Sequence, residues 1–306
     1  MVLSSLFDWF SRLGSRYSPE GRGLLASEFI FLKSRVDTGS RFFGEVIPPG
    51  SPGELPREIY MFWDKGFDAA PDVVKLCCES WKKHNEGWNL NLLSLDDANS
   101  ILKVDSMPEG FAMAHYADAL RTTILAERGG VWADATLLCA KRLDDWLLPM
   151  FNQSRFFAFY RPGPDRLLSN WFLAATASSV LAAGWREVYF DFLRDGYGPS
   201  TPYFFHHYLF EFMVGQSSAH RKAWKSVPKL SAEPSHLMQH LLSHESNAAQ
   251  CLERLRHVPL HKLTWKEPSR VNAQSVLELL ELMRESGLSQ GCDEVAQARK
   301  DPPDVD

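Results

Sequence analysis

The sequence lacks the features of secreted, membrane-spanning and nucleic-acid-binding proteins. Its cysteines number only five, and no two have CxxC spacing. Neither a disulfide framework nor a thiolate zinc site is therefore indicated, and a reducing compartment is favoured. No apolar run approaches the ~18 residues of a membrane span, and the N-terminus has no signal-peptide pattern. The net charge of −5 argues against a general nucleic-acid binder. We therefore expect a cytoplasmic protein with no nucleic-acid partner.

Several common catalytic motifs are also absent. The sequence contains neither a GxGxxG dinucleotide loop nor a GxxxxGK[ST] phosphate loop. It also has no GxSxG nucleophile elbow and no HExxH zinc helix. These absences count against a dehydrogenase, a P-loop kinase, a serine hydrolase and a zincin.

The chain divides by composition into three parts. Residues 1–50 predict a helical extension that ends in a linker rich in proline and glycine. Residues 51–286 predict one globular domain, and residues 287–306 are polar and predict a disordered tail. An apolar helical stripe within residues 1–13 either docks on its own domain or lies in a membrane interface, which would place the protein at the inner face of a membrane. The stripe consists of Leu3, Leu6, Phe7, Phe10 and Leu13.

The central part alternates between strand and helix patterns. Strands are expected at 57–63, 89–93, 130–134 and 156–160, because apolar, aromatic and branched residues gather there. Helical periodicity lies between these strands, and again at 276–283, with a cap near Asn272. This alternation predicts an α/β fold with a mostly parallel central sheet and added helices.

The segment 114–136 is the most informative part of the chain. A helix carries Asp118 and Arg121 three residues apart, and therefore on one face. A Gly-Gly break then leads into a short apolar strand that ends at Asp134. Open α/β sheets bind ligands at the carboxyl ends of their strands. These three side chains could hold a sugar, a diphosphate and a metal. The alternatives are a surface ion pair and a structural cap.

Other candidates lie at strand ends and in aromatic runs. Phe62 and Trp63 could stack on a nucleobase or pack in the core. Asn170 could bind sugar hydroxyls or cap a turn. His206 and His207 are adjacent and therefore diverge, so one could face the site while the other packs.

The last candidate segment is His-Lys-Leu-Thr-Trp-Lys at 261–266. His261 is a suitable manganese or zinc ligand, and Lys262 and Thr264 can bind phosphate oxygens. As a loop, this segment could close over a diphosphate and exclude water. A structural role for the histidine is the alternative.

Six segments, taken in order, resemble the capsular polysaccharide synthesis glycosyltransferases, a group within the DXD-containing, sugar-binding glycosyltransferases. They are IYMFWDKG (59–66), SWKKHN (80–85), HYADALR (115–121), GGVWADAT (129–136), SNWF (169–172) and HKLTW (261–265). The resemblance implies a GT-A fold and a nucleotide-sugar donor, with UDP as the expected nucleotide and Mn²⁺ or Mg²⁺ on its diphosphate. It also implies retaining transfer to a glycan or lipid-linked glycan acceptor in capsular or surface polysaccharide synthesis.

The resemblance also implies roles for individual residues. Asp118 and Arg121 would hold the donor sugar, and Asn170 would lie near that sugar or the acceptor. Asp134 and His261 would approach the metal. The remaining contacts to the nucleotide sugar would come from Phe62, Trp63, Lys262, Thr264 and Trp265.

One position departs from the usual two-acid metal motif, because Asp134 is followed by Ala135 and Thr136. The capsular subgroup commonly has this Asp-Ala-Thr form. It leaves one carboxylate fewer for a cation. A nucleotide-sugar or glycan-binding protein without catalytic activity is therefore the second interpretation.

Overall fold

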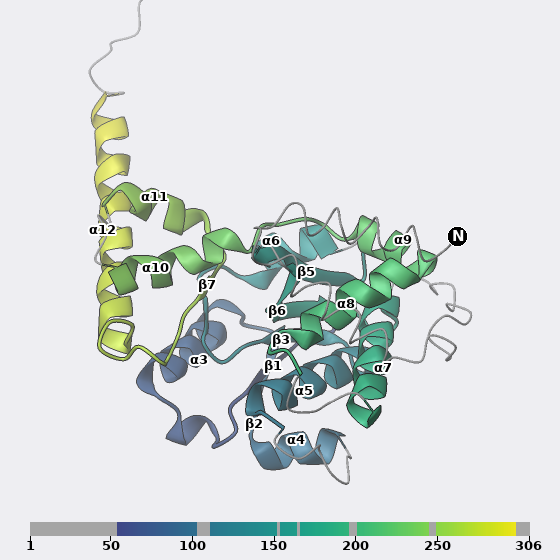
Figure 1. The fold of residues 1–306 in the computed structure, drawn as a ribbon. Helices are drawn as coiled ribbons and strands as arrows, with labels where there is room; N and C mark the ends of the chain where they lie inside the picture. Colours follow the sequence, from purple (N-terminus) through teal and green to yellow (C-terminus); the bar gives the residue numbers. More distant parts are fainter. Residues whose placement is uncertain are drawn as a thin grey trace, which may run out of the picture. The chain divides into compact units, whose positions relative to one another are not determined.

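The structure, a computed structural model, describes residues 54–102, 111–151, 154–163, 166–195, 201–244 and 249–297. The apolar stripe within residues 1–13 and the expected linker lie outside the described residues. The described chain forms two compact units, whereas the sequence predicted one domain. The first unit comprises residues 54–67, 87–134 and 144–233, and the second comprises 68–86, 135–143 and 234–297. Figure 1 shows the elements of both units.

The first unit is built on a five-stranded sheet with the order β2-β1-β3-β6-β5. β1 pairs in parallel with β2 and with β3, while β6 runs antiparallel to β3 and β5. Four of the five strands therefore point the same way, which confirms the mostly parallel α/β sheet. The strands are β1 (Glu58–Phe62), β2 (Asn89–Leu93), β3 (Gly130–Ala133), β5 (Phe156–Gly163) and β6 (Arg166–Ala175).

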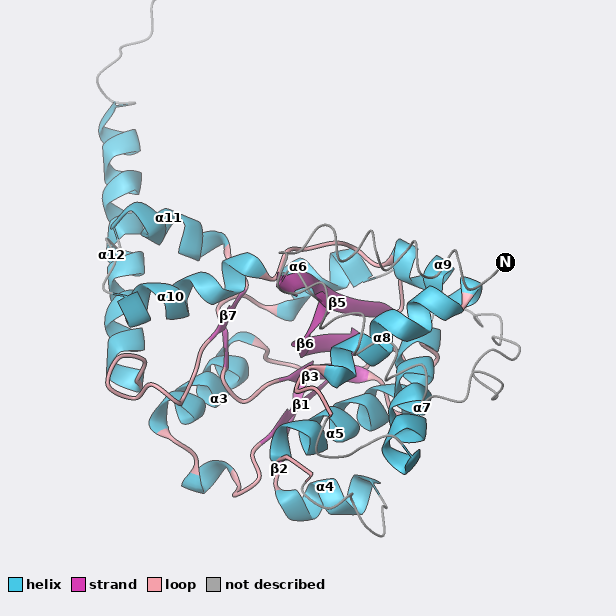
Figure 2. Cartoon of the chain, viewed as in Figure 1, coloured by secondary structure: helices cyan, strands magenta, loops and turns pink. Residues whose placement is uncertain are grey.

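Helices cover both faces of this sheet (Figure 2). Trp146 of α6 packs against Phe157, Phe159 and Phe172 on one face. On the other face, α5 contacts β3, β6 and α7, and α8 contacts β6 and α7. The helices of this unit are α4 (Leu95–Leu102), α5 (Met113–Glu127), α6 (Leu143–Phe151), α7 (Val180–Asp195), α8 (Phe205–Gln216) and α9 (Ser218–Ser226). The short 3-10 turn η2 (Phe67–Ala69) begins at the last residue of the unit's first segment.

Gly129 and Gly130 turn the chain from α5 into β3. Their φ angles are +72° and +101°, in the left-handed region that favours glycine. A Cβ on Gly129 would lie 2.8 Å from the carbonyl oxygen of Ala175, and one on Gly130 would lie 2.7 Å from that of Glu58. The Gly-Gly break is therefore required both by backbone conformation and by the close approach of two neighbouring strands.

The second unit contains a two-stranded antiparallel ladder of β4 and β7. Side chains of α3 fasten β4: the Trp81 indole N–H donates to the Leu137 carbonyl at 2.7 Å, and the Ser80 hydroxyl accepts from the Cys139 N–H at 2.9 Å. Ser80 and Trp81 both belong to the SWKKHN segment, so these two residues of the segment have a structural role in holding β4. The elements are α3 (Asp72–His84), β4 (Leu137–Cys139), η3 (Glu233–His236), α10 (Leu237–His244), α11 (Ala249–His257), β7 (Leu260–Lys262) and α12 (Ala273–Gln297).

The C-terminal helix differs from expectation in its length. Asn272 caps α12, as predicted, by accepting a hydrogen bond from the Ser275 N–H at 3.0 Å. The helix then continues past Gly287 to Gln297, where the sequence predicted a polar tail without structure. A single glycine costs a helix only about 1 kcal/mol, so it need not end one. Within the described residues, no helix has the length and apolar character needed to cross a bilayer.

Candidate functional site

The carboxyl ends of β1 and β3 form one edge of the first unit's sheet. Because these strands are parallel neighbours, with Tyr60 opposite Trp132, the residues that follow them emerge at the same edge. Trp63 follows β1 and is half-buried, and Asp134 follows β3. Phe62 is instead buried and stacks on Tyr116 at 6.2 Å between ring centroids, an arrangement that suits core packing.

Helix α5 delivers two charged side chains to this edge. Asp118 and Arg121 are each only 5% exposed, because α5 is buried on nearly all sides. The Arg121 Nε lies 3.4 Å from Asp118 Oδ1, and one terminal nitrogen of Arg121 lies 3.3 Å from Asp134 Oδ1. The structure thus brings the three residues together, as the sequence predicted. A buried ion pair of this kind excludes the surface-pair alternative.

The Arg121 guanidinium is fixed from several directions. It donates to the backbone carbonyls of Ala117 and Asn170, and its carbon lies 5.0 Å from the Trp132 ring centroid. The Trp132 indole N–H donates to Asp134 Oδ1 at 3.0 Å. Arg121 therefore bridges two carboxylates rigidly, and the three charges together leave the cluster net negative.

A second set of contacts surrounds Asp118. Asn170 Nδ2 donates to Asp118 Oδ1 at 2.8 Å, and His206 Nδ1 lies 3.1 Å from the same oxygen. Of the two adjacent histidines, His206 therefore faces the cluster, as one of them was expected to do. His207 is also buried and lies 5.6 Å from the Phe204 ring, edge-on.

Charge and burial set the protonation of these groups. Burial alone would raise the pKa of Asp118, but His206 and Arg121 outweigh it and lower the pKa to about 2. Burial lowers the pKa of His206 despite the nearby carboxylate, and it lowers the pKa of His207 further. At neutral pH the cluster therefore contains an ionised Asp118 beside neutral imidazoles.

The remaining predicted residues belong to the second unit. His261 lies in strand β7 and not in a loop, and it is fully buried. Neither of its ring nitrogens has a hydrogen-bond partner among the described residues, and burial lowers its pKa to about 4. Lys262 donates to the Thr136 hydroxyl. Thr264 accepts a hydrogen bond from the Lys266 N–H at 3.2 Å, and Trp265 is 44% exposed.

The described residues do not supply a metal centre by themselves. No group of three His, Cys, Asp or Glu side chains in the described chain is placed to bind one ion. Asp134 already accepts from Trp132 and lies beside the Arg121 cation.

Two contacts of the site were not predicted from the sequence, namely that of Trp132 with Asp134 and that of His206 with Asp118. Trp132 could have been found, because residues two apart in a strand share a face, and it precedes Asp134 by two. His206 could not have been assigned to Asp118, because only the packing of α8 against β6 and α7 brings them together. Tyr203, which is 61% exposed, lies nearby, with its ring 5.8 Å from that of His115 on α5.

Comparison with known proteins finds relatives that are named as glycosyltransferases. The chain is 26% identical over 233 residues to the glycosyltransferase afumC of Aspergillus fumigatus, covering 69% of this chain and 57% of that protein. It is 27% identical over 163 residues to the O-glycosyltransferase braB of Annulohypoxylon truncatum, covering 46% and 38%. The chain thus spans about half the length, or less, of these relatives.

Among solved structures, the apo-form glycosyltransferase GlyE of Streptococcus pneumoniae TIGR4 aligns with 11% identity and a TM-score of 0.42. It covers 78% of this chain and 64% of that one. The profile of one family, described as "Capsular polysaccharide synthesis protein", matches residues 45–280. That match spans most of the sequence, and the chain therefore belongs to the capsular polysaccharide synthesis protein family.

Proposed function

We propose that the protein is a retaining glycosyltransferase with a GT-A type fold, which moves a sugar from a nucleoside-diphosphate donor to a glycan acceptor. The observation that carries this proposal is the contact of Asp118, Arg121 and Asp134 at the carboxyl edge of the parallel strands. Such an edge is where open α/β sheets bind nucleotides. Family membership supports the same reading.

In this proposal Asp118 accepts hydrogen bonds from hydroxyls of the donor sugar. Its pKa of about 2 keeps it ionised at neutral pH, so it suits a role as acceptor and not as proton donor. Arg121 fixes Asp118 and Asp134 relative to each other, and the Asn170 amide donates a hydrogen bond to Asp118. In many enzymes, preorganised charges of this kind make the largest single contribution to stabilisation of the transition state.

Trp63 would stack on the base, and Asp134 would face the diphosphate. Lys262, Thr264, Trp265 and His261 would contact the phosphates or the metal, as the family resemblance implies. A Mn²⁺ or Mg²⁺ ion, when bound, would stabilise the charge that develops on the leaving diphosphate. We expect the leaving phosphate to take the proton of the acceptor hydroxyl, so that no separate protein base is required.

A thermal-shift screen tests the proposal. UDP, GDP, CMP and their common sugars would each be added with and without Mn²⁺, because a ligand that binds the native state raises its melting temperature. We expect a shift with UDP-sugars that grows with Mn²⁺, followed by release of free UDP on adding a glycan acceptor, lipid-linked or free. The absence of a shift with every donor would contradict the proposal.

The second candidate is a nucleotide-sugar or glycan-binding protein without turnover. It is favoured by Thr136, which stands where an Asp-X-Asp metal motif has its second acid, and by the absence of a three-ligand group among the described side chains. Binding of a donor without release of its nucleoside diphosphate would select this candidate. A position at the inner face of a membrane through residues 1–13 stays a prediction, and liposome flotation with and without residues 1–45 tests it.

A further inference from the structure

The carboxylate of Asp118 is held by one of its two oxygens. Asn170 Nδ2, His206 Nδ1 and Arg121 Nε lie 2.8, 3.1 and 3.4 Å from Oδ1. Among the described residues no hydrogen bond is formed with Oδ2, and Oδ2 is not among the buried polar atoms that lack a partner. Oδ2 is therefore the oxygen that a ligand can reach.

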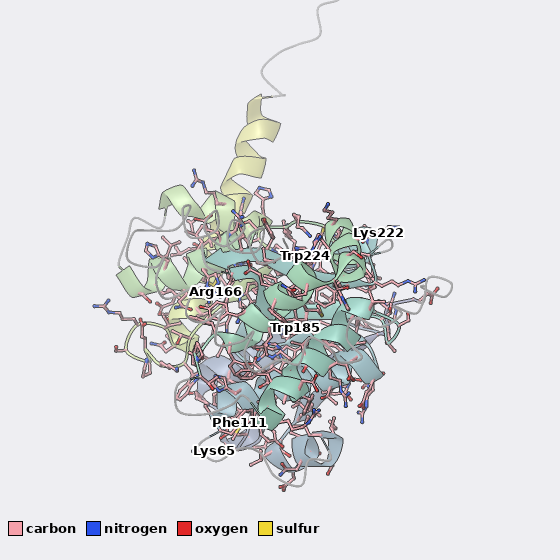
Figure 3. The ribbon with its side chains drawn as sticks, turned by 45° about the vertical axis from the view of Figure 1, so that its right-hand side comes forward. Lys65, Phe111, Arg166, Trp185, Lys222 and Trp224 are labelled. Carbon is pink, nitrogen blue, oxygen red and sulfur yellow. The ribbon has the colours of Figure 1, made fainter. Side chains whose placement is uncertain are left out.

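The His206 ring is held by aromatic packing on two sides. The side chain is fully buried, and the ring stacks on Trp185 with 4.1 Å between centroids and 12° between planes. Tyr189 meets the ring edge-on at 5.2 Å, and the Trp185 indole N–H donates to the His206 carbonyl at 2.9 Å. Figure 3 labels Trp185 on α7, in the first unit. These contacts fix the direction in which Nδ1 points.

The surroundings of the ring also select its tautomer. If Nδ1 carried the lone pair, that lone pair could accept from Asn170 Nδ2 at 3.2 Å, but it would also face the Asp118 carboxylate at 3.1 Å, and the Nε2–H would be a buried donor. Nε2 has no hydrogen-bond partner among the described residues. In the Nε2–H tautomer, the buried N–H without an acceptor would cost its full desolvation free energy. In the Nδ1–H tautomer, the ring donates directly to the carboxylate.

We propose that His206 is a positioning residue: as the Nδ1–H tautomer it anchors Asp118 Oδ1, so that Oδ2 is presented to a hydroxyl of the donor sugar. The claim that Oδ2 binds a sugar hydroxyl rests on the proposed function, whereas the claim about the tautomer of His206 does not. His206 itself touches no substrate in this arrangement. Its effect should therefore appear in the recognition of the sugar and not of the nucleotide.

Two variants separate positioning from packing. His206→Asn places an amide N–H near the position of Nδ1, whereas His206→Leu fills space but donates nothing. We expect His206→Leu to lower kcat/KM for the sugar nucleotide by about 10²-fold, in line with the cost of a small misplacement. We expect His206→Asn to recover most of that loss, and the Kd of the sugar-free nucleoside diphosphate to stay unchanged in both. His220→Asn is the control, because His220 is another buried histidine of this unit, 4% exposed, and packs against Gly184.

Nitrogen-15 NMR of the histidine rings gives a readout that needs no activity. The spectrum of the wild-type protein, assigned by the signals lost in His206→Asn, should show protonated Nδ1 and unprotonated Nε2 at neutral pH. A protonated Nε2 would overturn the inference, as would equal activity of the Leu and Asn variants or a parallel loss of nucleotide affinity. If the wild-type protein bound no sugar nucleotide, the proposed function and the claim that Oδ2 binds a sugar hydroxyl would both fail, while the spectrum would still decide the tautomer.

Discussion

Replacement of Arg121 by methionine should destabilise the first unit strongly. Arg121 is 5% exposed and lies 3.4 Å from one carboxylate oxygen and 3.3 Å from another. At an effective dielectric constant of about 20, two unit charges 3.4 Å apart attract by about 5 kcal/mol. Removing one partner of a buried ion pair typically costs about 3–5 kcal/mol, because the remaining charge stays buried. We expect a loss in this range, which corresponds to a fall in Tm of about 10 °C.

Arg186 provides a matched control. It also pairs with two carboxylates, Glu127 at 3.2 Å and Glu187 at 3.1 Å, and it also lies over an aromatic ring, Phe190. Its side chain is 31% exposed, so Arg186→Met should cost less than about 1 kcal/mol. Calorimetry and urea titration of both variants measure the difference.

A double-mutant cycle decides whether the buried charge is the cause. The double variant Arg121→Met, Asp118→Asn no longer contains the buried Asp118 carboxylate that Arg121→Met alone leaves unpaired. It should therefore be at least about 1 kcal/mol more stable than the sum of the two single losses predicts. Additive losses, or a loss for Arg121→Met no larger than for Arg186→Met, would refute the reasoning.

Three further predictions concern the remaining site residues. Asp134→Ala should lower turnover by at least about 10²-fold in a donor-hydrolysis or transfer assay, with a smaller fall in Tm than Arg121→Met because Arg121 keeps its pair with Asp118; near-normal turnover would remove Asp134 from the site. Trp63→Ala should weaken nucleotide binding by about tenfold in calorimetric titration, because stacking on a base contributes about 1–3 kcal/mol; unchanged affinity would argue against stacking. Burial lowers the pKa of His261 to about 4 from its ordinary 6.5, so the unfolded chain binds a proton first as the pH falls. The free energy of unfolding should therefore drop by about 3 kcal/mol between about pH 6.5 and about pH 4 from this residue, and His261→Asn should lessen that drop in urea titrations at several pH values. An equal drop in the variant would contradict the burial of a neutral ring.

Local sequence patterns predicted four of the five strands of the first unit's sheet. The aromatic and branched run that became β1, the alternation of β2 and the Gly-Gly break before β3 are short-range signals, and the structure confirms each of them. They are readable because strand and helix periods depend on neighbouring residues. β6 was not predicted as a strand, because Ser169 and Asn170 resemble turn residues and only pairing with β3 and β5 makes them part of a sheet. The β7 strand was likewise taken for a loop, since it is short and depends on β4.

The sequence by itself determined which residues could meet. The i,i+3 spacing put Asp118 and Arg121 on one helix face, and the glycine break put Asp134 at the end of the next strand, because both relations are local. Only the tertiary structure decided that Arg121 bridges both carboxylates, that His206 anchors one oxygen of Asp118, and that the described chain divides into two units. Those relations join segments far apart in the chain. They arise from the way α5, α7 and α8 pack on the sheet, which no local spacing specifies.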